Sequence, residues 1–255
     1  LKDQNILENI ALKSEIDKDT LVIEIGVGAA ALTNVTCNYA KNVIGYEIDE
    51  TLKPIINEVL GDKDNVEIIF TDFLKRNVKE DIKKYEYKKL YVVANLPYYI
   101  TTPIIMKLLE EKLDIQSITV MIQKEVADRL IEIPGGKNTG AITYAINYYS
   151  VPEGIMEVPN SSFIPEPEVT SEIIKMDLRY KPVVDVENPQ IMFRIIKSAF
   201  MQRRKTLLNA LTNTKVFLNK EEGLKILKKV KLDENVRAEE LSIQDFANIA
   251  KSIVR

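Results

Sequence analysis

Short apolar runs alternate with helical patterns over the first 125 residues of the chain. The runs are rich in Val, Ile and Leu, and in the stretches between them apolar residues recur every three or four positions. This alternation is typical of a parallel sheet whose strands are joined by helices. We predict strands at Leu21–Ile25, Asn42–Tyr46, Val66–Phe70, Leu90–Ala94 and Ser117–Ile122.

Three helices are expected between these strands, over Ala30–Ala40, Thr51–Leu60 and Pro103–Lys112. In the third, Thr102 is placed to be the N-cap and Pro103 the first helical residue, a position that tolerates proline. The connections therefore have the length and pattern of strand-helix-strand units.

The second half of the chain carries a different pattern. After a glycine-containing loop over residues 134–140, Tyr144–Tyr149 and Ser171–Leu178 are predicted to be extended, and the chain is helical in pattern from about Pro189. Ser242 is placed to cap the last helix. We predict a Rossmann-like α/β domain over residues 1–180 and a small all-helical domain over residues 181–255.

Composition excludes several kinds of chemistry. The 255 residues contain one cysteine, Cys37, and no histidine, which excludes Cys/His zinc sites and Ser-His-Asp triads. We expect Cys37 and the tyrosines of 144–149 to be core residues, and we expect no metal.

No apolar run approaches the roughly 18 residues of a membrane span, and the first residues do not resemble a signal peptide. The expectation is a soluble, cytoplasmic monomer.

Charge is divided unevenly along the chain. Residues 181–255 carry 15 Lys/Arg and 9 Asp/Glu, a net charge of +6, which leaves 20 basic and 29 acidic residues, a net charge of −9, in residues 1–180. Within the basic part, Arg203, Arg204 and Lys205 are consecutive. Such a run is usually a solvated helix face, but it also suits contacts with the phosphates of a nucleic acid.

Polar residues and glycines stand where the predicted strands end. Gly26 and Gly28 follow the first strand, Glu47 the second and Asp72 the third. In a parallel sheet these ends meet at one edge, where nucleotide ligands bind. Glu47 lies 21 positions after Gly26, about where an acidic residue takes ribose hydroxyls. Asp49 is a competitor for that role but is better placed to cap the next helix.

The fourth strand runs into Asn95-Leu96-Pro97-Tyr98-Tyr99. An asparagine oxygen and a neighbouring backbone carbonyl can accept both hydrogens of an aromatic amine and aim its lone pair outward. Tyr98 offers a face on which a base can stack. By itself the segment fits an ordinary strand-ending turn equally well. The first glycine turn also fits NAD, but a dehydrogenase needs a proton-transfer residue that is not evident here, which favours a methyl donor.

Seven segments, taken in order along the chain, resemble those of the KsgA-type ribosomal RNA small-subunit adenine N6,N6-dimethyltransferases. They are Asp3-Gln4-Asn5-Ile6-Leu7, Glu24-Ile25-Gly26-Val27-Gly28, Glu47-Ile48-Asp49, Asn95-Leu96-Pro97-Tyr98-Tyr99-Ile100, Phe163-Ile164-Pro165-Glu166-Pro167-Glu168-Val169, Phe200-Met201-Gln202-Arg203-Arg204-Lys205-Thr206-Leu207 and Arg237-Ala238-Glu239-Glu240-Leu241-Ser242. Asp3 and Ile6 depart from the family's usual Gly and Phe, the link to the first strand is short, and Ala30 stands where a further glycine is common.

The resemblance implies a class I S-adenosylmethionine-dependent methyltransferase that adds two methyls to each of two adjacent adenosines in a hairpin near the 3′ end of small-subunit rRNA. Its partner would be the small ribosomal subunit, late in assembly. It implies cofactor contacts at Asn5, Leu7, Gly26, Gly28, Glu47, Asp72 and Asn95, an amine site at Asn95 and Leu96, and Tyr98 and Phe163 on either side of the base. Arg203, Arg204 and Lys205 would contact RNA.

Other interpretations stay open on the sequence alone. A large-subunit rRNA adenine methyltransferase that confers macrolide resistance has a related pattern, although Tyr99 and the Arg203–Lys205 run favour the small-subunit enzyme. A non-catalytic ribosome-assembly or transcription factor would keep the fold, and an NAD dehydrogenase is a third alternative. The prolines after Phe163 are also typical of a rigid interdomain linker.

Overall fold

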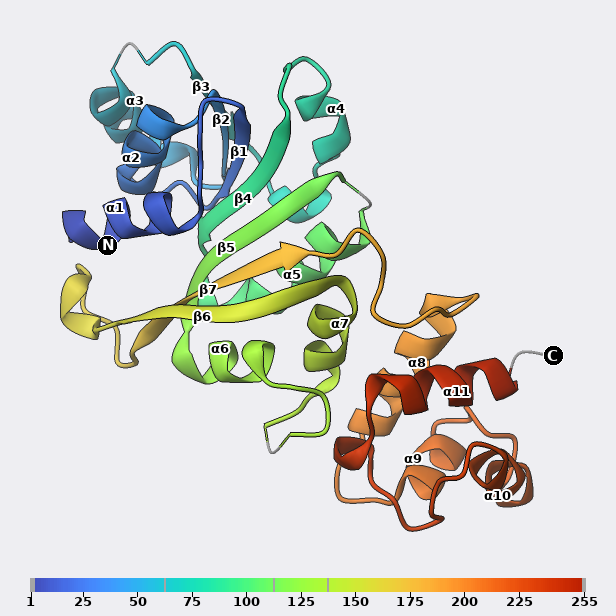
Figure 1. Ribbon diagram of the computed structural model, residues 1–255. Coiled ribbons are helices and arrows are strands. Elements are labelled where there is room, and N and C mark those ends of the chain that lie inside the picture. Colours follow the sequence, from blue (N-terminus) through green and yellow to red (C-terminus); the bar gives the residue numbers. More distant parts are fainter. Residues whose placement is uncertain (1–2, 62, 112, 137, 254–255) are drawn as a thin grey trace. The chain divides into compact units, whose positions relative to one another are not determined.

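A computed structural model shows that the chain folds into two compact units (Figure 1). It describes residues 3–61, 63–111, 113–136 and 138–253. Unit 1 comprises the chain up to Ala127 together with Val151–Leu178, and unit 2 comprises Asp128–Ser150 and the chain from Arg179 onward. The described residues of 128–150 thus pack with the second unit, although we predicted that they belong to the first domain. Each unit is described by itself.

Unit 1 is built on a seven-stranded sheet in the order β3-β2-β1-β4-β5-β7-β6. Strands β1 to β5 pair in parallel and β7 pairs antiparallel with β5. The strand bounds are β1 Thr20–Ile25, β2 Asn42–Glu47, β3 Val66–Phe70, β4 Lys89–Asn95, β5 Ile115–Gln123, β6 Ser150–Val158 and β7 Ser171–Leu178. The five predicted parallel strands are therefore confirmed to within two residues at each end, as is the extended segment that became β7.

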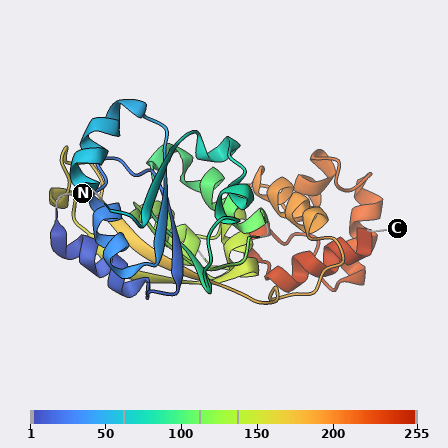
Figure 2. The same cartoon turned by 90° about the horizontal axis from the view of Figure 1, so that it is seen from above.

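The order of strands reverses between β1 and β4. From β1 the chain proceeds through β2 to β3, then returns to the other side of β1 and continues through β4 to β5. Right-handed crossovers place the connecting helices of the two halves on opposite faces of such a sheet. Figure 2 shows the blue helices α1 and α2 on one side of the strands and the green α4 and α5 on the other. The carboxyl ends of β1 and β4 consequently diverge and leave a crevice.

Helices cover the sheet of unit 1 because their apolar faces pack on its buried strands. Every residue of β1 is buried, and one cluster joins it to residues of α1 and α2 that include Leu7, Val35 and Cys37. The helix bounds are α1 Gln4–Lys13, α2 Ala31–Tyr39, α3 Lys53–Leu60, α4 Val78–Ile82 and α5 Thr101–Glu110, and α6 Lys124–Ile131 begins in unit 1 and ends in unit 2. The prediction that Cys37 is a buried core residue is confirmed.

The start of α5 differs from the prediction. The helix begins at Thr101, so Thr102 is not its N-cap and Pro103 is its third residue; Lys112, the predicted end, lies outside the described residues. A 3₁₀ turn, η3 (Tyr98–Ile100), leads directly into the helix, and the Thr101 hydroxyl donates to the Pro97 carbonyl at 3.1 Å. The helix therefore starts from this turn without a side-chain N-cap.

The prediction of an extended segment at Tyr144–Tyr149 is wrong, because this stretch forms the helix α7 (Ala141–Tyr149). Its aromatic content favours a strand on propensity alone. Tyr144 and Tyr148 stand four residues apart, share one helix face and are both buried in the core of unit 2, as expected of core residues. The Tyr144 hydroxyl donates to the Leu241 carbonyl at 2.6 Å. Tertiary packing therefore overrides the local preference.

Unit 2 is helical in its described part. Beside α7 it contains α8 Pro189–Phe200, α9 Leu207–Asn213, α10 Lys220–Lys229 and α11 Ile243–Ile253. Asn188 and Asn219 cap α8 and α10, and the Ser242 hydroxyl accepts the Asp245 N–H at 3.2 Å at the start of α11. The predicted helical tail and the Ser242 cap are confirmed. No helix in the described ranges is long and apolar enough to cross a membrane.

Candidate active site

A pocket of about 680 Å³ lies within unit 1 where the carboxyl ends of four parallel strands meet. Its walls come from the turns that follow β1, β2, β3 and β4, and from the segment that joins β6 to β7. Of the residues predicted from the sequence, it brings together Gly26, Gly28, Glu47, Asp72, Asn95, Leu96, Tyr98 and Phe163. A pocket of this size suits a small molecule.

The turn after β1 approaches the pocket with bare backbone. Gly26 and Gly28 have φ angles of 76° and 57°, in the region that favours glycine. A Cβ at Gly26 would stand 3.6 Å from the Asn95 carbonyl oxygen, which is an ordinary contact, so the positive φ and not a lack of space favours glycine here. Ala30, where the resemblance leads one to expect another glycine, has a φ of 60°. That left-handed conformation accounts for the preference for glycine at this position.

Glu47, the last residue of β2, is held in place by backbone donors. One carboxylate oxygen accepts the Gly28 N–H at 2.8 Å, and the other accepts the N–H groups of Ile48 and Asp49 at 2.8 and 2.9 Å. The side chain is buried, yet it lines the pocket. Its remaining acceptor capacity is available at the pocket, where a carboxylate suits ribose hydroxyls. Asp49 caps the 3₁₀ turn η1 (Glu50–Leu52), as predicted.

Asp72 and an aromatic floor form the next part of the pocket. Asp72 caps the 3₁₀ turn η2 (Phe73–Lys75) through the Leu74 N–H at 3.0 Å. The Phe73 ring meets the Tyr46 ring edge to face, with the centroids 5.2 Å apart. The Tyr46 hydroxyl in turn donates to Asp81 at 2.9 Å. Aromatic side chains held in place beside a carboxylate acceptor suit an aromatic base that carries an amine.

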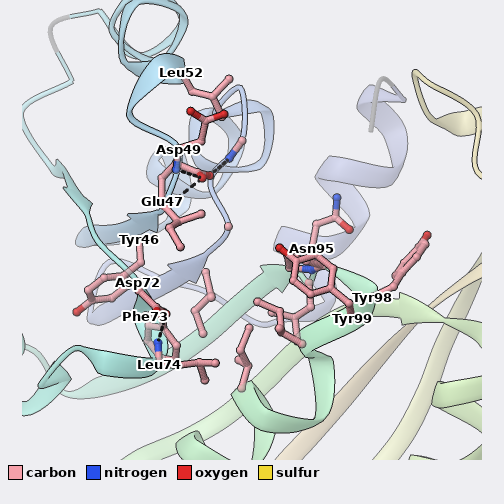
Figure 3. Close-up of a pocket in the computed structure, with 18 of the residues that line it drawn as sticks. Tyr46, Glu47, Asp49, Leu52, Asp72, Phe73, Leu74, Asn95, Tyr98 and Tyr99 are labelled. Atoms are coloured by element: carbon pink, nitrogen blue, oxygen red, sulfur yellow. Dashed lines mark hydrogen bonds between the residues drawn. The ribbon is translucent and has the colours of Figure 1, made fainter.

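Asn95, Leu96 and Tyr98 also line the pocket. Figure 3 shows Asn95 and Tyr98 together on the side away from Asp49 and Asp72. Asn95 is the last residue of β4, and the N–H of the buried Leu96 donates to the Met121 carbonyl at 3.1 Å, which ties the segment to β5. The Tyr98 hydroxyl is 2.9 Å from the hydroxyl of Ser171. The Asn95 side-chain amide, in contrast, makes no hydrogen bond among the described residues. It is therefore available to a ligand.

Phe163 reaches the pocket from the connection between β6 and β7, together with Pro165 and Pro167. Because this whole connection belongs to unit 1, it is not the interdomain linker that its prolines suggested. The prolines instead stiffen a segment at the rim of the pocket. Phe163 is half-buried and packs against the core of unit 1.

Five predicted site residues do not line the pocket. Leu7 is buried in the core under α1, and Asn5 is exposed on the same helix. Arg203, Arg204 and Lys205 belong to unit 2 and lie in a turn, because α8 ends at Phe200; their prediction as part of a helix is wrong. Arg203 donates to the Thr139 carbonyl at 2.8 Å. Arg204 and Lys205 are exposed and have no side-chain partner among the described residues.

One buried acid near the pocket was not assigned a role from the sequence. Glu24 lies within β1, is 1% exposed, and one of its carboxyl oxygens has no hydrogen-bond partner in the described chain. Burial raises the pKa of Glu24 to about 8; the Thr33 hydroxyl opposes the rise, and the charge of Glu47 adds to it. A single acidic residue inside the apolar run Leu21–Ile25 is the sequence signal that would have revealed it.

The pocket thus offers a bare glycine turn, a fixed carboxylate that suits ribose hydroxyls and an aromatic floor beside Asp72, with an unpaired amide at its far end. These features fit an adenosine-containing cofactor next to an amine acceptor. Together with the sheet, they define a class I S-adenosylmethionine-dependent methyltransferase, which confirms the predicted fold class and cofactor.

Comparison with known proteins identifies the family. The whole chain, residues 1–255, matches the family described as ribosomal RNA adenine dimethylase. Ribosomal RNA small subunit methyltransferase A of Alkaliphilus metalliredigens is 46% identical over 254 residues, which cover 99% of this chain and 88% of the relative. The protein of the same name from Alkaliphilus oremlandii is 44% identical over 256 residues, which cover 100% and 89%. The chain therefore belongs to the ribosomal RNA adenine dimethylase family.

Solved structures show the same fold. A dimethyladenosine transferase from Plasmodium falciparum superimposes with a TM-score of 0.80 at 24% identity and covers 98% of this chain and 95% of its own. The 23S rRNA methyltransferase ErmE gives a TM-score of 0.71 at 21% identity, with 99% and 98% covered. At these identities the likeness concerns the fold alone.

Proposed function

We propose that this enzyme dimethylates the N6 amines of two adjacent adenosines in a hairpin near the 3′ end of small-subunit rRNA, as a step in ribosome assembly. The observation that carries the proposal is the unpaired Asn95 amide at one end of a pocket whose other end is built for a nucleoside. The small-subunit substrate is supported by the names of the relatives that match the full chain. We propose that the protein acts as a monomer in the cytoplasm.

The cofactor end of the pocket binds and orients without taking part in proton transfer. Glu47 would accept the two ribose hydroxyls, Asp72 the amine of the cofactor's adenine, and the Gly26–Gly28 turn would lie against the rest of the molecule. Asn5 and Leu7 are proposed to contribute from the start of the chain. S-adenosylmethionine, when bound, supplies a methyl group activated by a positive sulfonium.

The amine end of the pocket prepares the nucleophile. The adenine amine is a poor nucleophile because its lone pair is delocalised into the ring. The Asn95 side-chain oxygen and the Leu96 carbonyl would accept its two hydrogens and turn the lone pair outward. Tyr98 and Phe163 would hold the flipped-out base between them. No general base is required, since the nitrogen becomes acidic once it is alkylated and loses its proton to water.

Arg204 and Lys205, with Arg203 beside them, are proposed to contact rRNA phosphates. Such contacts add affinity without reading sequence. The basic excess of residues 181–255 supports this assignment.

The decisive experiment offers the enzyme isotope-labelled S-adenosylmethionine with isolated, unmethylated small and large ribosomal subunits. Mass spectrometry of the rRNA should find two N6,N6-dimethyladenosines in the small subunit and no label in the large one. Label in large-subunit rRNA would favour the macrolide-resistance activity. No label in either subunit, with assembly function retained by Asn95→Ala, would favour a non-catalytic assembly factor.

A further inference from the structure

Tyr99 lines the pocket, but its side chain packs little against the rest of the described chain. Its side chain is 83% exposed although it lines the same pocket as Asn95 and Tyr98. It makes no hydrogen bond, ion pair or ring contact among the described residues. Single exposed aromatic residues are common on protein surfaces. This one differs because it stands at the rim of a binding pocket.

The backbone beneath Tyr99 is firmly held. The residue lies in η3, between Pro97, whose ring fixes its φ, and Thr101, whose hydroxyl donates to the Pro97 carbonyl at 3.1 Å. The Ile100 N–H donates to the same carbonyl at 3.2 Å. The ring of Tyr99 is thus carried by a backbone that is already ordered, so stacking of a ligand on it requires no ordering of the main chain.

Tyr98 and Tyr99 cannot face the same base. Successive residues of a 3₁₀ helix are rotated by about 120° because the helix has three residues per turn. Tyr98 is half-buried and its hydroxyl is committed to Ser171, whereas the Tyr99 ring extends to a different side (Figure 3). The two tyrosines therefore offer two separate stacking faces at one amine site.

We propose that Tyr99 stacks against the nucleobase next to the adenosine that occupies the amine pocket. The inference rests on the proposed function, in which the two target adenosines are neighbours in the RNA. A base pulled from its helix loses stacking on its neighbour, so the neighbouring base exposes a flat face close to the pocket rim. An aromatic ring there replaces the lost stacking and tolerates any base. Tyr99 is accordingly a positioning residue for the substrate strand.

The test compares two substrates and four proteins. The substrates are unmethylated small subunits with intact rRNA, and subunits reconstituted with rRNA in which one of the two adenosines is replaced by an abasic nucleotide. The proteins are the wild type, Tyr99→Ala, Tyr99→Phe and, as a matched control, Tyr180→Ala, which removes a tyrosine that is 98% exposed and does not line the pocket. The readout is kcat/KM for methylation of the remaining adenosine.

We expect the abasic nucleotide to lower kcat/KM of the wild type about 5- to 150-fold, the range given by base stacking on an aromatic side chain. Tyr99→Ala should show a similar loss on intact subunits and no further loss on abasic ones. Tyr99→Phe keeps the ring and should behave like the wild type. Tyr180→Ala should leave the ratio between the two substrates unchanged.

Two results would overturn the inference. If Tyr99→Ala lowered kcat/KM equally on both substrates, Tyr99 would act on the target base or on the fold. If Tyr99→Ala lowered kcat/KM on neither substrate, its ring would make no contribution to substrate positioning. Failure of the proposed function shows itself separately, because the wild type would then leave intact small subunits unmethylated.

Discussion

The two ends of the pocket are built in opposite ways. At the cofactor end, backbone N–H groups from the chain itself already bond both oxygens of Glu47 and one oxygen of Asp72. At the amine end, the Asn95 amide and the Tyr99 ring have no partner among the described residues. A carboxylate held by several donors is ordered before a ligand arrives, whereas an unpaired amide obtains its partners from the substrate. Under the proposed function, the enzyme is thus pre-organised for its cofactor and left open for RNA.

Glu24 lies close to the cofactor end but lacks the backbone hydrogen bonds that Glu47 accepts. Its substitution is expected to have the largest effect, which is on stability. The ordinary glutamate pKa of 4.5 applies to the unfolded chain, and the pKa of Glu24 in the folded protein is about 8. Between these values the unfolded chain binds fewer protons, so the free energy of unfolding falls as the pH rises. Glu24→Gln removes this loss. The free energy of unfolding of the variant should therefore rise by roughly 4–5 kcal/mol relative to that of the wild type between pH 4.5 and pH 8.

Denaturant unfolding of the ligand-free protein across this pH range measures the effect. Asp49→Asn is the control and should keep a pH profile parallel to that of the wild type from pH 4.5 to pH 8, since the Thr51 hydroxyl and N–H lower the pKa of Asp49 below its ordinary value of 3.8. The stability from Asp49 is present above pH 3.8 and is lost only as the pH falls below it. If the free energies of unfolding of the wild type and of Glu24→Gln changed in parallel with pH, the Glu24 carboxyl group would not be destabilised by its burial.

Asn95→Ala tests the open end of the pocket. Removing one pre-aligned hydrogen-bonding group from a reacting centre typically lowers kcat by about 10²–10³-fold, and we expect that loss for methyl transfer to small subunits. The affinity for S-adenosylmethionine, measured by calorimetry, should change much less. Asn57→Ala, which alters an exposed asparagine on α3, should retain full activity. More than a tenth of the wild-type kcat in Asn95→Ala would argue against its role in aligning the amine.

Glu47→Gln tests the pre-organised end. The change removes the charge from the acceptor proposed for the ribose, and hydrogen bonds to charged groups contribute about 1.5–3 kcal/mol each. The Kd for S-adenosylmethionine should therefore rise about 10- to 150-fold, with a smaller effect on kcat at saturating cofactor. Asp49→Asn is the matched control, because Asp49 is occupied in capping η1. A larger rise in Kd for Asp49→Asn would reverse the assignment.

The turn Arg203–Lys205 of unit 2 shows the same contrast between a bonded group and an unpaired group, and it gives the smallest expected effect. Arg203 is tied to the Thr139 carbonyl and its guanidinium lies 5.8 Å from the Phe200 ring centroid, whereas Arg204 is exposed and unpaired within the described chain. Arg204→Ala should reduce the slope of log K for rRNA against log salt by about one, and Arg203→Ala by less. Filter binding at several salt concentrations measures both slopes. Unchanged slopes in both variants would argue against an RNA contact at this turn.

The pattern of apolar residues predicted secondary structure well where a strand is buried along its whole length. Strands such as β1 and β4 are covered on both faces, so they appear in the sequence as short apolar runs. The same reasoning failed at Tyr144–Tyr149, where aromatic residues favour a strand locally but contact the core of unit 2 from one face of a helix. The Phe163–Pro167 segment was ambiguous for a similar reason, since prolines stiffen a pocket rim and a linker equally well.

The sequence by itself determined the chemistry of the site: which strand ends carry glycine, carboxylate and amide, and that no histidine is present to serve as a base. Tertiary structure decided how those groups work. The reversal of strand order between β1 and β4 opens the crevice that gathers them, and the turn at Gly28 supplies a donor that fixes Glu47. Burial of Glu24 arises in the same way, because the exclusion of solvent from its carboxyl group depends on neighbours that are distant in the sequence.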